Sequence, residues 1–184
     1  MNRKGFTLIE IVIVLAIISI LAAIITPLVV NSLKQAKLAK ASADVKTLGE
    51  AMVNFRKDLG FWPVKNASNN GVDMLYGSGT IPSNWNAYSN RITFDYHLVD
   101  NSNNYRRGPS PQGFPCWNGP YIGEIKRDPW NNSYLVNARH LEGASNPDYT
   151  KKVWVISAGE NKVVDTDFNG VLNTNGDDLT FRLQ

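Results

Sequence analysis

Residues 4–10 of the chain read Lys-Gly-Phe-Thr-Leu-Ile-Glu, and a run without charge follows from residue 11 to residue 30. Two hydroxyl residues and Pro27 are the breaks in its aliphatic character. Twenty helical residues at about 1.5 Å each span roughly 30 Å, the thickness of a bilayer core. Because Arg3 and Lys4 precede the run, we expect a cytoplasmic N-terminus and a single crossing of the membrane.

A secretory signal peptide, cut near Ala22 or Ala23, is the simplest alternative for this run. Two features oppose it: a helical pattern continues beyond the run, and an acid, Glu10, stands at its entry. An acid at the centre of a membrane costs about 2.5–3.5 kcal/mol and less near an end, so Glu10 needs a partner. Pro27 lacks an N–H, and it either kinks or loosens the helix or is simply tolerated there.

Residues 4–10 resemble the class III signal of type IV pilins and their relatives. The resemblance implies that a prepilin peptidase removes the leader, residues 1–5, by cutting between Gly5 and Phe6, and that the new amine of Phe6 is methylated. It also implies that Glu10 pairs with the Phe6 amine of a neighbouring subunit during filament assembly. Two unpaired charges in lipid would then become one neutral pair.

The helix is expected to continue as an amphipathic segment within residues 31–63. Its apolar residues are spaced alternately four and three apart, which places them on one face that packs on a domain core. These residues are Ala41, Val45, Leu48, Met52, Phe55 and Leu59. Gly60 and Pro63 predict the end of the helix. Residues 6–30 then form the membrane or filament-core half of one long helix.

Residues 64–116 are rich in Asn, Ser, Gly and Pro and predict a variable loop region, with a short strand or helix at 91–99. Three short β-rich runs follow, at residues 128–136, 151–157 and 180–183. We expect an α+β fold in which the long helix packs on a small antiparallel sheet. The sheet and an acidic loop occupy residues 117–184, and residues 31–184 form one globular domain.

The middle of the chain carries four aromatic residues that could stack on sugars: Trp85, Tyr88, Trp117 and Tyr121. We favour packing against the helix, since aromatic side chains mostly supply buried area. The single cysteine, Cys116, cannot form an intramolecular disulfide and is expected to be a buried small hydrophobic residue.

Composition excludes several classes of protein. Hydrophobic residues make up 43% and charged residues 19%, so the chain is not disordered as a whole. A net charge of +3 is too weak for a nucleic-acid partner to be expected. The two histidines, His97 and His140, have no second ligand at zinc-site spacing. No catalytic constellation stands out, so we expect no enzyme.

Segments of the C-terminal third resemble the major pseudopilin of type II secretion systems. They are residues 119–122, 128–134, 157–161 and 176–179. The resemblance implies a structural subunit of a secretion pseudopilus that polymerises with itself. It further implies minor pseudopilins, an inner-membrane assembly platform and prepilin peptidase as partners. The subunit would cross the bacterial inner membrane once and hold its C-terminal domain in the periplasm. The alternative is a surface type IV pilin for adhesion, motility or DNA uptake, with residues 64–115 as its binding face.

The acidic loop carries oxygen-bearing side chains at alternate positions: Asp165, Asp167 and Asn169. Such spacing lets oxygens converge on one ion, and calcium takes six to eight oxygen ligands. An EF-hand is rejected because Gly176 stands where the twelfth-position Glu belongs. Further candidate ligands are Asp177, Asp178, Asn161, Asn173 and Asn175. The resemblance also implies calcium in this loop, whereas the alternative is a solvated turn.

Overall fold

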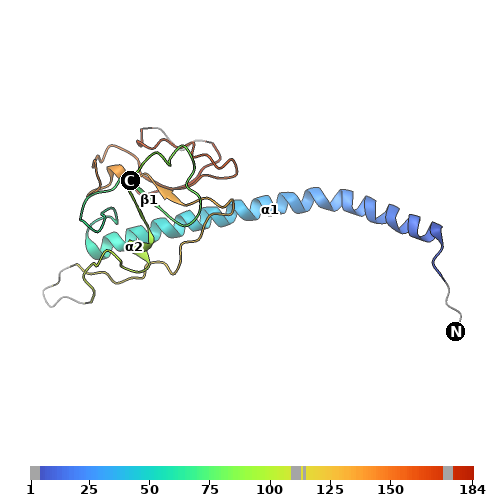
Figure 1. Ribbon diagram of the computed structural model, residues 1–184, viewed down its shortest axis with the longest axis horizontal. Coiled ribbons are helices and arrows are strands. Elements are labelled where there is room, and N and C mark those ends of the chain that lie inside the picture. Colours follow the sequence, from blue (N-terminus) through green and yellow to red (C-terminus); the bar gives the residue numbers. More distant parts are fainter. Residues whose placement is uncertain (1–4, 109–112, 114, 172–175) are drawn as a thin grey trace. The chain divides into compact units, whose positions relative to one another are not determined.

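The computed structural model of the chain describes residues 5–108, 113, 115–171 and 176–184. Its longest element is the helix α1 (Leu8–Leu59) (Figure 1). The other elements are β1 (Met74–Tyr76), β2 (Arg91–Thr93), α2 (Asp95–Leu98), β3 (Leu135–Val136), the 3₁₀ helix η1 (Ala138–His140), β4 (Trp154–Ser157) and β5 (Leu179–Arg182). The chain divides into two compact units, and the division falls inside α1, between Lys37 and Leu38.

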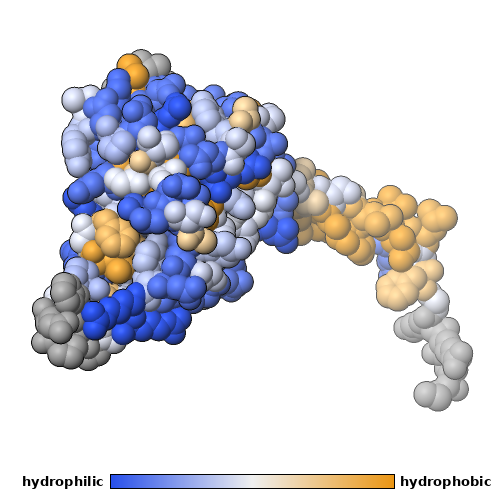
Figure 2. All heavy atoms as spheres, turned by 60° about the vertical axis from the view of Figure 1, so that its left-hand side comes forward, coloured by the Kyte–Doolittle hydropathy of each residue, from blue (hydrophilic) through white to orange (hydrophobic). Residues whose placement is uncertain are grey.

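In the first unit, the large apolar side chains of α1 face outward. Those from Leu8 to Leu33 are 47–82% exposed, and Figure 2 shows them as a continuous hydrophobic surface. This helix is long and apolar enough to cross a membrane. Its few hydroxyl groups donate hydrogen bonds to carbonyls one turn earlier, as Thr26 does to Ala22 at 2.7 Å. α1 is continuous through Pro27.

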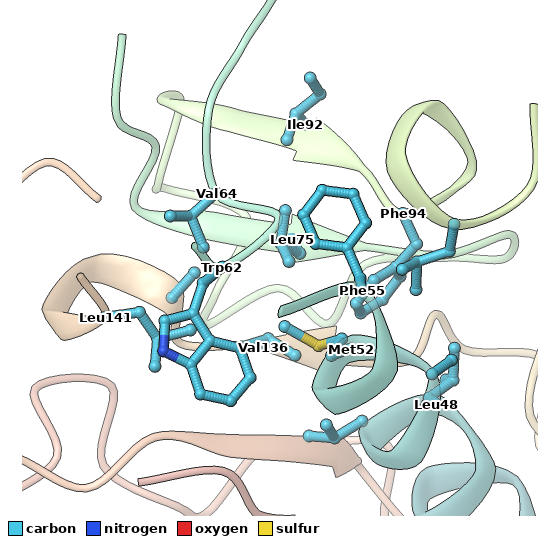
Figure 3. Close-up of a cluster of buried hydrophobic side chains, with 14 of the residues drawn as sticks. Leu48, Met52, Phe55, Trp62, Val64, Leu75, Ile92, Phe94, Val136 and Leu141 are labelled. Carbon is cyan, nitrogen blue, oxygen red and sulfur yellow. The ribbon is translucent and has the colours of Figure 1, made fainter. Parts of the chain in front are cut away.

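In the second unit, the amphipathic stripe of α1 is buried as predicted. All six stripe residues are at most 5% exposed. Figure 3 shows Leu48, Met52 and Phe55 directed toward side chains of the sheet, including Leu75 and Val136. The helix ends at Leu59, where the following glycine has a φ of +78° and donates its N–H to the Arg56 carbonyl at 2.7 Å. That conformation is the usual glycine stop.

The five strands form one sheet in the order β2-β1-β3-β4-β5. The pairs β1–β3, β3–β4 and β4–β5 are antiparallel, whereas β1 and β2 run parallel, with Leu75 opposite Ile92. The α+β class is confirmed, but the purely antiparallel sheet is a wrong prediction for this one pair. Parallel neighbours need a connection of about a dozen residues or more, and residues 77–90 supply it.

The predicted loop region contains two strands and a short helix. Residues 64–116 hold β1, β2 and α2, and they contribute Phe94 and Leu98 to the core. Trp85 and Trp117 are buried, and Tyr88 and Tyr121 pack half-buried against the same clusters. The prediction of packing against the helix is therefore confirmed for Trp117 and Tyr121, whose cluster includes residues of α1. It is wrong for Trp85 and Tyr88, which pack in a second cluster without α1 residues.

Cys116 is half-buried, so its prediction as a buried residue is wrong. Its neighbour Trp117 takes the inward position and donates its ring N–H to the His97 carbonyl at 2.7 Å. Adjacent residues of an extended chain point to opposite sides, which leaves Cys116 nearer the surface.

Candidate functional site

α1 begins with a reciprocal cap between Thr7 and Glu10. The Glu10 carboxylate accepts hydrogen bonds from the backbone N–H and the hydroxyl of Thr7, both at 2.8 Å. The Thr7 hydroxyl oxygen accepts the Glu10 N–H at 3.4 Å. This is a capping box, which satisfies donors that the first turn of a helix leaves without partners. Sequence reasoning missed it, although the Thr-x-x-Glu spacing is the known signal.

The cap leaves the predicted cleavage point just outside the helix. Gly5 and Phe6 precede it in an irregular, exposed segment, and Phe6 is 85% exposed. No heavy atom lies within 4 Å of the position where a Cβ of Gly5 would stand. The Gly5–Phe6 bond is therefore open to approach. In this chain the Phe6 nitrogen is an amide, and the Glu10 carboxylate accepts its hydrogen bonds from Thr7.

In the acidic loop, Asp177 and Asp178 each accept hydrogen bonds through one oxygen of the carboxylate. Asp177 Oδ2 accepts the backbone N–H groups of Glu160 at 2.6 Å and Asn161 at 3.0 Å. Asp178 Oδ2 accepts the N–H and the hydroxyl of Thr166, both at 2.6 Å. The second oxygen of each carboxylate, Oδ1, is buried without a hydrogen-bond partner in the described structure.

Asp165 and Asn161 lie beside these two carboxylates. Asn161 donates its side-chain N–H to Asp165 Oδ2 at 2.9 Å. A Cβ on Gly176, which has a φ of +66°, would collide with the Asp165 carboxylate, so this close approach requires glycine. Burial raises the pKa of Asp178 to about 6, hydrogen bonds from Thr166 oppose the shift, and the charge of Asp165 adds to it. We call Asn161, Asp165, Asp177 and Asp178 the acidic cluster.

Two other predicted ligands make contacts elsewhere. Asp167 Oδ2 accepts the Val171 N–H at 2.9 Å, which closes a local turn. Asn169 Oδ1 faces the Arg139 guanidinium at 3.4 Å. Asn173 and Asn175 lie outside the described residues.

The acidic cluster partly fits a calcium site. Among the residues that the structure describes, no three His, Cys, Asp or Glu side chains form a group able to hold a metal ion. The carboxylates are instead engaged in hydrogen bonds: Asp177 accepts the backbone N–H groups of residues 160 and 161, and Asp178 accepts the N–H and the hydroxyl of Thr166. However, the two buried oxygens without donors match what a hard cation requires, since buried carboxylate oxygens need a proton donor or a cation.

Comparison with known proteins finds matches to the N-terminal segment and to longer parts of the chain. Residues 1–26 match the family model described as the prokaryotic N-terminal methylation motif. The type II secretion system core protein G of Pseudomonas aeruginosa is 36% identical over 88 residues, which cover 46% of this chain and 60% of that protein. By this motif and this relative, the chain resembles the type IV pilin-like proteins.

Two further relatives carry a secretion name and a fimbrial name. The type II secretion system core protein G of Escherichia coli is 27% identical over 135 residues, or 73% of this chain and 72% of that protein. Fimbrial protein EcpC of Eikenella corrodens is 39% identical over 66 residues, which cover 36% of this chain and 43% of that protein. No solved structure matches this chain.

Proposed function

We propose that this pilin-like chain is the repeating structural subunit of a type II secretion pseudopilus, with a structural rather than a catalytic role. One observation carries the proposal: the apolar half of α1 is exposed on all sides and starts at the Thr7–Glu10 cap, which lies within the methylation motif of residues 1–26. Such a surface must be covered by lipid or by other protein chains. The relatives named core protein G favour secretion over a surface pilus.

In the membrane, the uncut subunit would cross the inner membrane once and hold residues 38–184 in the periplasm. Prepilin peptidase would cut after Gly5 and methylate Phe6. The new amine is a cation near the level of Glu10, and on docking, Glu10 of one subunit would turn from Thr7 to the amine of another. The assembly platform and minor pseudopilins are the proposed partners, because extraction from lipid and initiation of a filament need other components.

We further propose that the acidic cluster binds calcium. The side-chain oxygens of Asn161, Asp165, Asp177 and Asp178 would hold it, and Asp167 and Asn169 would join only after giving up their present contacts. A divalent cation would pair with the two buried Oδ1 oxygens that have no hydrogen-bond partner among the described residues. In a chain with one cysteine, the ion would order the loop as a disulfide does elsewhere.

The test compares Glu10→Ala with Glu50→Ala in the source bacterium, with the chain otherwise intact. Glu50 is a matched control because it lies on the other half of α1, is 57% exposed at its side chain and pairs with Lys46. We expect Glu10→Ala to reduce the filament fraction and cargo secretion at least about tenfold, since loss of a charge pair in lipid costs more than about 1.4 kcal/mol. Glu50→Ala should leave both unchanged. Equal assembly by the two variants would refute the proposal.

A surface pilin is the second candidate, and the likeness to fimbrial protein EcpC favours it. That likeness covers about a third of the chain, 36%, whereas the Escherichia coli alignment covers 73%. Deletion of the gene separates the two functions. Loss of protein export with normal adhesion supports the pseudopilus, and loss of adhesion or motility with normal export supports the pilin.

A further inference from the structure

Residues 84–88, which lie in the long connection between β1 and β2, contact the acidic loop. The Phe168 ring is stacked on Tyr88, with 3.5 Å between ring centroids and 6° between planes. The rings of Trp85 and Phe168 are nearly perpendicular, with their centroids 4.8 Å apart. Asn84 donates its side-chain N–H to the Val164 carbonyl at 2.6 Å. We call Asn84, Trp85, Tyr88 and Phe168 the aromatic clamp.

The aromatic clamp belongs to a second core on the sheet face away from α1. Phe168 and Trp85 are 4% and 3% exposed and pack with Leu135 and Ile156. The adjacent strand residues Val136 and Val155 belong instead to the core that α1 covers. Since neighbouring residues of a strand point to opposite faces, the clamp and α1 lie on opposite sides of the sheet.

The contacts of the aromatic clamp flank the ligand-bearing part of the loop. Val164 and Phe168 stand immediately before and after residues 165–167, so both ends of this stretch are fixed. The Phe168 carbonyl is also held, because it accepts the side-chain N–H of buried Asn137 at 3.1 Å. Asp165 therefore projects from a short segment anchored at two points.

We propose that Asn84, Trp85 and Tyr88 are positioning residues for the cation site of the acidic cluster. They hold the Asp165 segment beside Asp177 and Asp178, so that little rearrangement remains when a divalent cation binds. The inference rests on the proposed calcium site. A fixed segment binds more tightly because the entropy of ordering it is lost on folding rather than on binding.

Fixing the Asp165 segment has a second physical effect. Without a cation, three carboxylates at one site repel one another and favour an open loop. The stacking of Phe168 on Tyr88 and the Asn84 hydrogen bond oppose this opening. The long connection between β1 and β2 thereby gains a role in this chain beyond linking two parallel strands.

Calorimetric titration with calcium chloride tests the proposal, using the full chain in detergent micelles. Two variants weaken the aromatic clamp: Tyr88→Leu removes the stacked ring, and Asn84→Ala removes one hydrogen bond from an exposed side chain. The second is the milder change, so it keeps the test valid if Tyr88→Leu fails to fold. Phe94→Leu is the matched control, because Phe94 is a buried ring in the same predicted loop region but belongs to the α1-side core.

We expect each clamp variant to weaken calcium binding about threefold to tenfold, which corresponds to the loss of one aromatic pair or one hydrogen bond. Phe94→Leu should change the affinity less than twofold, although it lowers the melting temperature. If the unchanged chain binds calcium and the clamp variants bind equally well, the positioning role is wrong and the calcium site stands. An equal loss in Phe94→Leu would also overturn the positioning role. If the unchanged chain binds no calcium, both proposals fail.

Discussion

The two halves of α1 are both rich in apolar residues, yet only one half is covered by its own chain. From Leu8 to Leu33 the large apolar side chains point in all directions and are exposed. From Ala41 to Leu59 they repeat four and three apart and are buried against the sheet. A helix that is apolar all round requires an apolar environment outside the chain, whereas a stripe requires only one packed face.

The two halves of α1 therefore contribute to different processes: the second half to folding stability and the first half to assembly. Burying a large aliphatic side chain contributes about 1.5–3 kcal/mol. In the second half that contribution stabilises the folded unit itself. In the first half it becomes available only when lipid or neighbouring subunits cover the surface.

The largest expected contrast is between Phe55→Ala and Ile18→Ala. Phe55 is fully buried and meets the rings of Phe61, Tyr105 and Tyr121 edge-on, so its truncation should lower the free energy of unfolding by about 3–5 kcal/mol. Ile18 is 55% exposed, and its truncation should change that free energy by less than about 0.5 kcal/mol. Denaturant unfolding of the full chain in detergent, followed by near-UV circular dichroism, measures both. Similar losses in the two variants would contradict the comparison.

Calcium should stabilise the second unit alone. At a free concentration about 100-fold above the dissociation constant, a ligand that binds only the folded state adds about 2.7 kcal/mol. Chelation should therefore lower the melting temperature of the unchanged chain but not that of Asp178→Asn. The helicity of the detergent-bound first half should stay constant. A chelator that leaves the melting temperature of the unchanged chain unaltered would count against the ion.

Acid should lower the free energy of unfolding through His97, which is buried in the core beneath α1. Burial lowers the pKa of this side chain to about 3, against the smaller opposing effect of Asp100. The unfolded chain takes up the proton near pH 6.5 and the folded chain only near pH 3, so stability falls as the pH drops through this window. Between pH 6.5 and 5 the loss should be about 2 kcal/mol.

The matched variant for this effect is His97→Gln, which keeps a polar side chain but does not titrate. Its unfolding free energy should fall less with acid than that of the unchanged chain, and the raised pKa of Asp178 contributes equally to both. Parallel pH curves for the two proteins would show that His97 does not carry the effect.

Periodic patterns allowed much of the fold to be predicted. The spacing from Ala41 to Leu59 predicted the buried face of α1, and the β-rich run at residues 151–157 contains β4. Strand β1 was missed because its three residues lie in a segment dominated by turn-forming residues. Its parallel pairing with β2 depends on the path of a long connection, which local patterns do not encode.

Local sequence patterns also predicted the candidate sites only in part. Alternate spacing identified Asp165 as a candidate ligand, but it could not show that Asp167 would bond to the Val171 amide instead. The stacking of Tyr88 on Phe168 joins residues 80 positions apart and leaves no local signal. The Thr7–Glu10 cap, in contrast, is a local motif that could have been predicted from sequence.

Intact mass spectrometry of the chain purified from bacterial membranes tests the central claim most directly. The claim is that the apolar half of α1 is retained as an assembly element. It predicts a mature chain that begins at Phe6 and carries one additional methyl group on its N-terminal amine. A chain that begins after Ala22 or Ala23 would show that this half is a discarded signal peptide and would contradict the account.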